Sequence, residues 1–477
     1  MSERVLVIGA GPGGYVAALR AASLGAEVTI IEKENVGGTC LNYGCIPSKI
    51  LMSSADLFLN CKKADKFGIT GENSLFMDMA ALMQRKQKII ETQRQGILAL
   101  LKKSQVKFEQ GRGEIKGNGM ASIAAGDGHK RDIPFDKLIL ATGTIPFNIP
   151  AFPFDGSRIL SSDNLLDLKE IPKSIVIVGG GVIGCEFAFI LSALGSTVTI
   201  IEAMSRLLPL PSVDESCSKI LQREMKKKKM KFMTDRVVTK AELKGDMLCV
   251  TIGASPFLDK EKQAKIKPQC IEVEKMAVCI GRSPLAGDIG LENIGLKTDK
   301  KGWLQVNDKM ETEIPGVYAI GDILGPSKVM LAHVASHEGM VAADNAMGGN
   351  RKMHYHAVPG AIFTTPEIGD VGITESEARR KDLDVRCFSV NFRNLGKAQA
   401  MGEIAGEAKI VAEKKSEKIL GVHIIGPHAT ELIAEGTLAV NKGLLISDIA
   451  ETIHAHPTLA EIMSEVSLKA AGMAVHG

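Results

Sequence analysis

The sequence predicts an α/β protein with two parallel-sheet domains of the same kind. A strand–glycine turn–helix–strand pattern occurs twice in the 477 residues. Glycine is abundant at 49 residues, whereas aromatic side chains make up only 4%. Abundant glycine suits parallel α/β domains in which backbone segments approach closely, and this length corresponds to about three domains.

The repeated pattern begins near the N-terminus as VLVIGAGPGG, a helical stretch and LGAEVTIIE. It returns as IVIVGGGVIG, a helical stretch and LGSTVTIIE, with every equivalent position shifted by 170 residues, as from Gly9 to Gly179. The stretch 174–201 is apolar enough to resemble a membrane helix, but its glycines favour strand–loop–helix–strand. The repeat pairs Gly9, Gly11, Gly14 and Glu32 with Gly179, Gly181, Gly184 and Glu202.

The residue types in each copy suit a dinucleotide. The first glycine allows a tight turn, the second lets the backbone approach a pyrophosphate, and the third lets helix and strand pack closely. The helix N-terminus favours the anion, and the closing acid can accept hydrogen bonds from a ribose. One glycine pattern is a weak signal, but two complete copies predict two Rossmann-like dinucleotide-binding domains. We expect FAD in one and a nicotinamide dinucleotide in the other.

The acid that closes the second copy favours NAD over NADP. The Glu202 carboxylate would repel a 2′-phosphate, and Arg206 is the only nearby cation. We expect Arg206 to be a solvated surface residue rather than a phosphate ligand.

Nine scattered cysteines do not form a disulfide scaffold, and we expect reduced thiols in a cytoplasmic protein. Cys40 and Cys45 directly follow the first repeat, in VGGTCLNYGCIPSK. A zinc site would need a second ligand pair at matching spacing, and none is present, so we expect no metal. The spacing alone also fits two unrelated buried cysteines, but the position after a dinucleotide unit favours a redox pair.

Four segments resemble the pyridine nucleotide–disulfide oxidoreductases. GGTCLNYGCIPSK resembles the family's redox-active segment, and KLILATG, ending at Gly143, resembles the strand that leaves its FAD domain. GVYAIGD at 316–322 resembles its second FAD fingerprint, and HAHPTLAE at 454–461 resembles its acid/base segment. The resemblance covers essentially the whole chain, in order.

Three features point to the branch of this family that oxidises dihydrolipoyl groups with NAD+. These are IHAHPTLAEI, the run MLAHVASHEG at 330–339, and Glu202. The last cysteine is Cys387, so the C-terminal redox pair of some relatives is absent, and we expect no lipoyl domain before Val5. Two alternatives remain. One is an NAD(P)H-dependent reductase of another small disulfide, as in glutathione reductase, and the other is a flavin-binding scaffold subunit of a multienzyme complex.

The resemblance implies catalytic roles for four residues. Cys40 would meet the substrate and Cys45 would face the flavin. His456, from the partner subunit of a homodimer, would be the acid/base, oriented by Glu461. His454 is expected to be structural.

The resemblance also implies residues that hold the cofactors. Lys49 and Glu186 would pair beside the flavin, and Asp322 would meet its ribityl chain. The remaining implied cofactor positions are Gly143, Gly281 and Ala332.

The organisation that the resemblance implies is an FAD-binding domain at 1–149, an NAD-binding domain at 150–279, a central segment at 280–350 that completes the FAD site, and a C-terminal α+β dimerisation domain at 351–477. Expected partners are lipoyl-bearing subunits of 2-oxo acid dehydrogenase or glycine cleavage complexes. A net charge of +3 gives no reason to expect nucleic acid or a membrane surface. We also expect a long amphipathic helix within 77–106 and a solvated helix end at the basic run 226–229, where docking of an acidic partner is the alternative.

Overall fold

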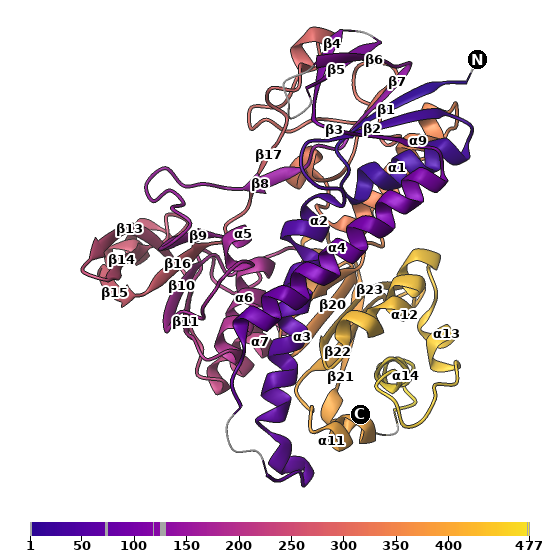
Figure 1. The fold of residues 1–477 in the computed structure, drawn as a ribbon. Helices are drawn as coiled ribbons and strands as arrows, with labels where there is room; N and C mark the ends of the chain where they lie inside the picture. The colour runs from indigo at the N-terminus through magenta and orange to yellow at the C-terminus, as the bar shows by residue number, and fades with distance from the viewer. Residues whose placement is uncertain (1, 72–74, 118, 125–129, 475, 477) are drawn as a thin grey trace. The chain divides into compact units, whose positions relative to one another are not determined.

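The computed structural model describes residues 2–71, 75–117, 119–124, 130–474 and 476 (Figure 1). The chain divides into two compact units. Unit 1 comprises 1–51, 78–147 and 281–355, and unit 2 comprises 52–77, 148–280 and 356–477. The chain thus leaves and re-enters unit 1 twice.

Unit 1 is built on a parallel sheet with the strand order β18-β7-β1-β2-β3. Successive residues Val5, Leu6 and Val7 of β1 are all buried, as expected for a parallel strand covered on both faces. Helices α1 and α9 pack against each other beside this sheet (Figure 1). The elements are β1 (Arg4–Ile8), α1 (Pro12–Ser23), β2 (Glu27–Glu32), β3 (Lys107–Gln110), β7 (Lys137–Leu140), β18 (Val317–Ala319) and α9 (Ala332–Ala346).

Further helices and strands complete unit 1. Helix α4 confirms the predicted amphipathic helix and begins after Asp78, whose carboxylate accepts the Ala81 N–H. An antiparallel sheet is formed by β4, β5 and β6, and β8 pairs with β17 where the chain leaves the unit and returns. The bounds are α2 (Gly38–Tyr43), α3 (Cys45–Cys61), η1 (Ala64–Phe67), α4 (Met79–Lys103), β4 (Arg112–Gly117), β5 (Met120–Ala124), β6 (Lys130–Pro134), β8 (Thr144–Pro146), β17 (Arg282–Pro284), η2 (Leu291–Ile294) and η3 (Gly321–Ser327), of which η1 and the end of α3 belong to unit 2.

Unit 2 contains a second parallel sheet, with the order β12-β11-β10-β16-β9, and an antiparallel sheet β13-β14-β15. The first three elements of its repeat are β10, α6 and β11, which confirms strand–loop–helix–strand for residues 174–201. Strand β10 and helix α6 begin and end 170 residues after β1 and α1. The bounds are β9 (Ile159–Ser161), α5 (Ser162–Leu165), β10 (Ser174–Val178), α6 (Val182–Ala193), β11 (Thr197–Ile201), α7 (Glu215–Lys227), β12 (Lys231–Met233), β13 (Arg236–Lys244), β14 (Met247–Ala254), α8 (Lys260–Ala264), β15 (Gln269–Val273) and β16 (Lys275–Val278).

The C-terminal part of unit 2 is the expected α+β structure, an antiparallel sheet of order β19-β20-β23-β22-β21 with helices packed against it. Lys409 of β22 makes ion pairs with Asp214, the N-cap of α7, and with Glu375, and so ties this part to α7. The bounds are β19 (Gly360–Ile362), β20 (Glu367–Gly372), α10 (Glu375–Arg380), β21 (Val385–Asn391), η4 (Phe392–Asn394), α11 (Gly396–Met401), β22 (Glu407–Glu413), β23 (Ile419–Gly426), α12 (Ala429–Lys442), α13 (Ile446–Ala450) and α14 (Glu461–Ala470).

Two of the nine cysteines differ from the prediction of reduced thiols. Cys249 of β14 and Cys270 of β15 form a disulfide, so the prediction of reduced thiols is wrong for these two residues. Their pairing depends on strand register, which the spacing of cysteines in the sequence does not reveal. Within the described ranges, no helix is long and apolar enough to cross a membrane, and no cluster of side chains is suited to a metal ion.

Candidate active site

The two glycine turns have the same geometry. Gly9 and Gly179 both have φ of 104°, a conformation that side chains rarely adopt. A Cβ on Gly14 would lie 1.9 Å from the carbonyl oxygen of Gly9, and a Cβ on Gly184 would lie 1.9 Å from that of Gly179. The first and third glycines of each turn are therefore required by the backbone itself.

The second glycine of each turn serves a different purpose. Gly11 and Gly181 are the N-caps of α1 and α6 and have ordinary φ values. A Cβ on Gly181 would meet no atom within 4 Å, and one on Gly11 would meet only Gly38 Cα at 3.9 Å. The protein leaves open space above both helix N-termini, which fits the pyrophosphate of a bound dinucleotide.

Glu32 and Glu202, the acids that close the two repeats, accept equivalent hydrogen bonds from the backbone. Glu32 accepts hydrogen bonds from the N–H groups of Ala10 (2.8 Å) and Glu34 (3.0 Å). Glu202 accepts them from Gly180 (2.6 Å) and Met204 (2.7 Å). Each buried carboxylate is thus fixed against its glycine turn, and each oxygen keeps a second lone pair for a ribose hydroxyl.

Arg206 is not the solvated surface residue that we expected. Its guanidinium donates to the carbonyl oxygens of Leu208 (2.7 Å), Leu210 (3.1 Å) and Val213 (3.0 Å). These bonds hold the loop after β11 and use three of the five N–H donors of the guanidinium, including both donors of Nη2. Sequence proximity to Glu202 could not distinguish a loop-bracing arginine from a free one.

Asp322, Gly143 and Gly281 lie around the paired strands β8 and β17 of unit 1. Gly143 accepts the N–H of Leu285, and Gly281 accepts that of Phe147, so each closes one end of the pair. The Asp322 carboxylate accepts the Thr144 hydroxyl at 3.3 Å, and burial raises its pKa. Arg282 donates to the Thr144 hydroxyl oxygen and carbonyl oxygen at 2.7 and 2.9 Å, which places a cation beside this carboxylate.

Glu338 and Tyr355 belong to the same region and were missed from the sequence. Glu338 accepts the N–H of Gly321 at 2.7 Å and the hydroxyl of Tyr355 at 2.6 Å. It therefore positions the loop that carries Asp322. Burial raises the pKa of Glu338 to about 7, despite these two hydrogen bonds. The one available signal was that Glu338 is the single carboxylate in the stretch 330–343.

Replacing Glu338 by glutamine is expected to flatten the pH dependence of the stability of unit 1. In the folded protein the pKa of Glu338 is about 7, against an ordinary value of 4.5. Between these values the folded state keeps a proton that the unfolded chain releases, so unfolding free energy falls as pH rises, by about 3 kcal/mol for this group. The measurement is the thermal unfolding midpoint against pH, followed by fluorescence of Trp303, the chain's only tryptophan, which lies in the same unit.

Asp136→Asn is the matched control for this measurement. The Arg4 guanidinium holds the pKa of Asp136 at about 2, so this group changes charge only below its ordinary value of 3.8. The control should keep the wild-type slope above pH 4.5. An unchanged slope in Glu338→Gln would show that Glu338 does not titrate in this range.

The thiol pair lies where the first repeat ends. Cys40 is in α2 and Cys45 begins α3, and a hydrogen bond joins the two side chains. That bond, followed by burial, raises the pKa of Cys40, and the positive charge of Lys49 opposes the shift. In the reduced pair the proton therefore stays on Cys40, and a base is needed to move it.

Asn42 anchors this segment and was not predicted. Its amide donates to the carbonyl oxygens of Val36 (3.2 Å) and Gly38 (2.8 Å), and it accepts a hydrogen bond from Arg94 of α4 at 2.7 Å. The redox segment is thereby fixed to the long helix of the same unit.

The predicted acid/base segment lies in unit 2. His456 is 76% exposed, and its Nδ1 lies 2.8 Å from Glu461 Oε1. Although burial opposes it, hydrogen bonds from His456 and Thr458 N–H hold the pKa of Glu461 below its ordinary value. Because a carboxylate only accepts, Nδ1 carries a proton and Nε2 is left free to exchange one.

His454 was expected to be structural, and its surroundings differ from those of His456. Its Nε2 lies 3.0 Å from Glu435 Oε1, and its Nδ1 lies 2.9 Å from the Thr452 carbonyl oxygen. Both ring nitrogens are engaged and the side chain is nearly buried, which agrees with a structural role.

The other predicted positions lie as follows. Glu186 is buried in α6, and its Oε1 accepts the N–H of Phe363 at 3.0 Å, while Ala332 is the first residue of α9. The basic run is the end of α7, where Lys226 and Lys228 lie over the rings of Phe232 and Phe189.

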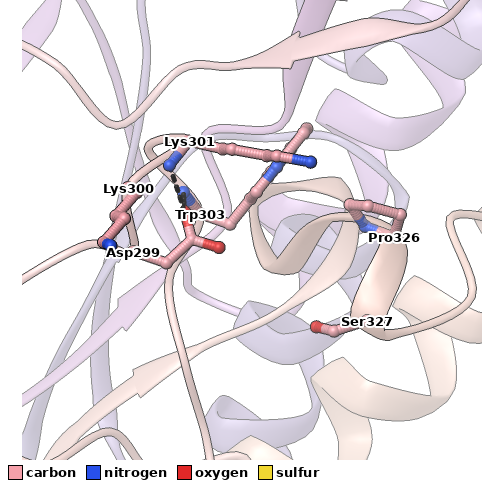
Figure 2. A pocket seen from close by; sticks show the side chains of 6 residues that line it. All are labelled: Asp299, Lys300, Lys301, Trp303, Pro326 and Ser327. Atoms are coloured by element: carbon pink, nitrogen blue, oxygen red, sulfur yellow. Dashed lines mark hydrogen bonds between the residues drawn. The ribbon is translucent and has the colours of Figure 1, made fainter.

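A pocket of about 380 Å³ in unit 1 contains none of the predicted site residues (Figure 2). The loop 299–303 lines this pocket, and the Asp299 carboxylate closes the loop by accepting hydrogen bonds from the N–H groups of Lys301 and Trp303 at 2.8 and 3.0 Å. The lining residues are Asp299, Lys300, Lys301, Trp303, Pro326 and Ser327.

The chain is similar to known proteins over its whole length. Residues 3–339 match the pyridine nucleotide-disulphide oxidoreductase family, and residues 358–467 match its dimerisation domain, which supports a homodimer. A dihydrolipoyl dehydrogenase of Chlamydia muridarum is 41% identical over 473 residues, which are 99% of this chain and 97% of the relative. One of Bacillus subtilis is 39% identical over 481 residues, covering 99% and 98% of the two chains.

A solved structure agrees with the fold. LpdA of Mycobacterium tuberculosis superimposes with a TM-score of 0.89 at 26% identity, covering 98% of this chain and 99% of that chain. The predicted fold class, family and enzyme class are thereby confirmed. The chain is an oxidoreductase that uses FAD and NAD, and it belongs to the pyridine nucleotide-disulphide oxidoreductase family.

Proposed function

We propose that the protein oxidises dihydrolipoyl groups carried by partner proteins and reduces NAD+, the activity named by its relatives in C. muridarum and B. subtilis. The observation that carries this proposal is the Cys40–Cys45 thiol pair, which directly follows a dinucleotide unit. No cysteine follows Cys387, so the 477-residue sequence has no C-terminal thiol pair that could pass electrons between the substrate and Cys40. A small or arm-borne disulfide that reaches Cys40 directly fits this arrangement.

The protein residues carry out the thiol chemistry. His456 of one subunit removes the proton from a dihydrolipoyl thiol, and the thiolate attacks Cys40 Sγ of the oxidised pair, which breaks the Cys40–Cys45 bond. The second substrate thiol attacks the substrate sulfur of the mixed disulfide, its proton passes to the departing Cys40 thiolate, and the substrate leaves as the cyclic disulfide. His456 then releases the first proton to the solution. Glu461 holds the imidazole in the required tautomer.

The two repeats are proposed to bind different dinucleotides. FAD would be held by the first repeat and by the loop of Asp322, and NAD by the second. Bound FAD supplies the acceptor through which the two electrons of the reduced thiol pair pass to NAD+. Lys49 and Glu186 are proposed as a pair beside it.

The second subunit completes the site in this proposal, because His456 comes from the partner. We accordingly expect the isolated monomer to be inactive. The proposed partners are lipoyl-bearing subunits of 2-oxo acid dehydrogenase or glycine cleavage complexes. We place the enzyme in the cytoplasm, where the many free cysteines would stay reduced.

An anaerobic titration with dihydrolipoamide tests the function. The flavin absorption should change on addition of the dithiol, and NADH should form when NAD+ is then added. Glutathione disulfide with NADPH is the parallel assay for the reductase alternative. A yellow protein that turns over neither substrate would instead support the scaffold alternative.

Replacing Glu202 by alanine is expected to raise the KM for NAD+ about 10- to 100-fold. The variant loses the acceptor for the ribose hydroxyls, and hydrogen bonds to a charged group contribute about 1.5–3 kcal/mol. Steady-state kinetics over a range of NAD+ concentrations measures the change. Because Glu202 also braces the Gly180 turn, circular dichroism of the variant should accompany the assay.

Glu32→Ala is the matched control, since Glu32 has the same contacts in the first repeat. It should lower the FAD content of the purified protein and leave the KM for NAD+ of the loaded fraction unchanged. An equal rise in KM for NAD+ in both variants would contradict the assignment of the two repeats.

A further inference from the structure

Cys249 and Cys270 form a disulfide between neighbouring strands of the sheet β13-β14-β15. Their Cα atoms are 5.9 Å apart. In the antiparallel register Thr251 is opposite Cys270, and Cys249 is opposite Glu272, so the two cysteines are diagonal neighbours on one face. This pair belongs to neither dinucleotide unit's glycine turn and is separate in sequence from Cys40 and Cys45.

The cysteines lie on the solvent face of the sheet. Residues that alternate with Cys249 in β14, namely Leu248, Val250 and Ile252, are buried in the hydrophobic core. The cysteine face instead carries charged side chains on both sides, with ion pairs Lys240–Glu242 and Lys244–Glu272, each at 2.7 Å. Because this face is polar, neither cysteine is needed to fill a core.

The remaining cysteines show the contrast. Cys185, Cys217 and Cys279 are buried, and burial raises the pKa of each thiol, which makes them unreactive core residues. Cys61 is exposed and is a free thiol. A bonded pair in which one cysteine is exposed can instead open and close its disulfide in contact with the solution.

We propose that Cys249 and Cys270 form a second thiol–disulfide exchange site, which reacts with low-molecular-weight monothiols. Cys270 is exposed and lies on the edge strand β15, whereas Cys249 lies on the central strand and is half-buried. Access therefore makes Cys270 the sulfur that is attacked.

The exchange balances in both directions. One monothiolate attacks Cys270 Sγ and forms a mixed disulfide, while the Cys249 thiolate leaves and takes up a proton. A second monothiolate attacks the small-molecule sulfur of the mixed disulfide and releases the Cys270 thiolate. The protein disulfide gains two electrons and two protons, and two monothiols become one small disulfide. In the reverse direction, the Cys249 thiolate attacks the mixed disulfide at Cys270 and expels the monothiol.

The test uses the reduced holoenzyme, glutathione disulfide as the probe, and peptide mass mapping without reductant. In the wild type, the internal disulfide should form and no glutathione should remain on either cysteine. In Cys249→Ser a glutathione adduct should persist on Cys270, because the resolving thiol is absent. In Cys270→Ser the adduct on Cys249 should form roughly tenfold more slowly, since that thiol is less accessible. Cys61 provides an internal reference, because its exposed thiol should keep its adduct in all three proteins.

Reduction of the disulfide can be tested in the wild-type protein alone. Reduced glutathione added to the oxidised wild type should open the disulfide at temperatures where the enzyme stays folded, as judged by its retained flavin. A disulfide that opens only on unfolding would overturn the proposal and identify a static cross-link. Equal adduct rates at Cys249 and Cys270 would overturn the assignment of Cys270 as the attacked sulfur.

Discussion

Replacing Cys45 by serine is expected to lower the rate of dihydrolipoamide oxidation with NAD+ by about 10⁴-fold or more, the effect typical of removing a residue that carries a covalent step. Without Cys45, Cys40 has no partner with which to form the disulfide that the substrate must reduce. A serine preserves the size of the side chain, so the helix α3 that begins at this position should be retained. The measurement is steady-state NADH formation, normalised to bound flavin.

Cys61→Ser is the matched control, because Cys61 is an exposed free thiol at the other end of the same helix. It should keep wild-type turnover and flavin content. Retained dihydrolipoamide oxidation in Cys45→Ser would contradict the proposed function, whatever the state of Cys249 and Cys270. Conversely, Cys249→Ser leaves Cys40 and Cys45 in place, so the two proposals can fail independently.

The repeated units could be predicted closely because their residue types follow from local sterics. A side chain at Gly14 would collide with the backbone of Gly9, and a side chain at Gly184 with that of Gly179. The strands, helices and closing acids follow from the same short pattern. Each of these features depends on a stretch of about 30 residues, so it can be predicted without knowledge of tertiary contacts.

Contacts between distant segments could not be predicted in this way. Glu338 meets Tyr355 and the Gly321 N–H only because α9 packs beside the loop after β18. The Cys249–Cys270 bond depends on the register of β14 and β15. Residues 52–77 belong to unit 2 although they follow the redox segment of unit 1. In each case the sequence contains the residues, and the fold determines which of them meet.

Replacing His456 by glutamine is expected to lower kcat for dihydrolipoamide oxidation about 10²- to 10⁴-fold, the usual contribution of a general acid–base. Glutamine can still form a hydrogen bond with Glu461 but cannot take and return a proton. The variant should also lose the part of the pH–rate profile that reports ionisation of the base. NADH formation between pH 5 and 9 measures both effects.

Two neighbouring substitutions distinguish proton transfer from structural damage. Glu461→Gln leaves the imidazole in place but removes the carboxylate that holds its Nδ1 proton, so kcat should fall less than in His456→Gln. His454→Gln breaks two hydrogen bonds of a nearly buried ring, and it should lower thermal stability while keeping the pH–rate profile. If His454→Gln instead abolished the pH-dependent limb and His456→Gln retained it, the roles of the two histidines would have to be exchanged. The exposed side chain of His456 favours the roles proposed here, because a base must reach a substrate that arrives from solution.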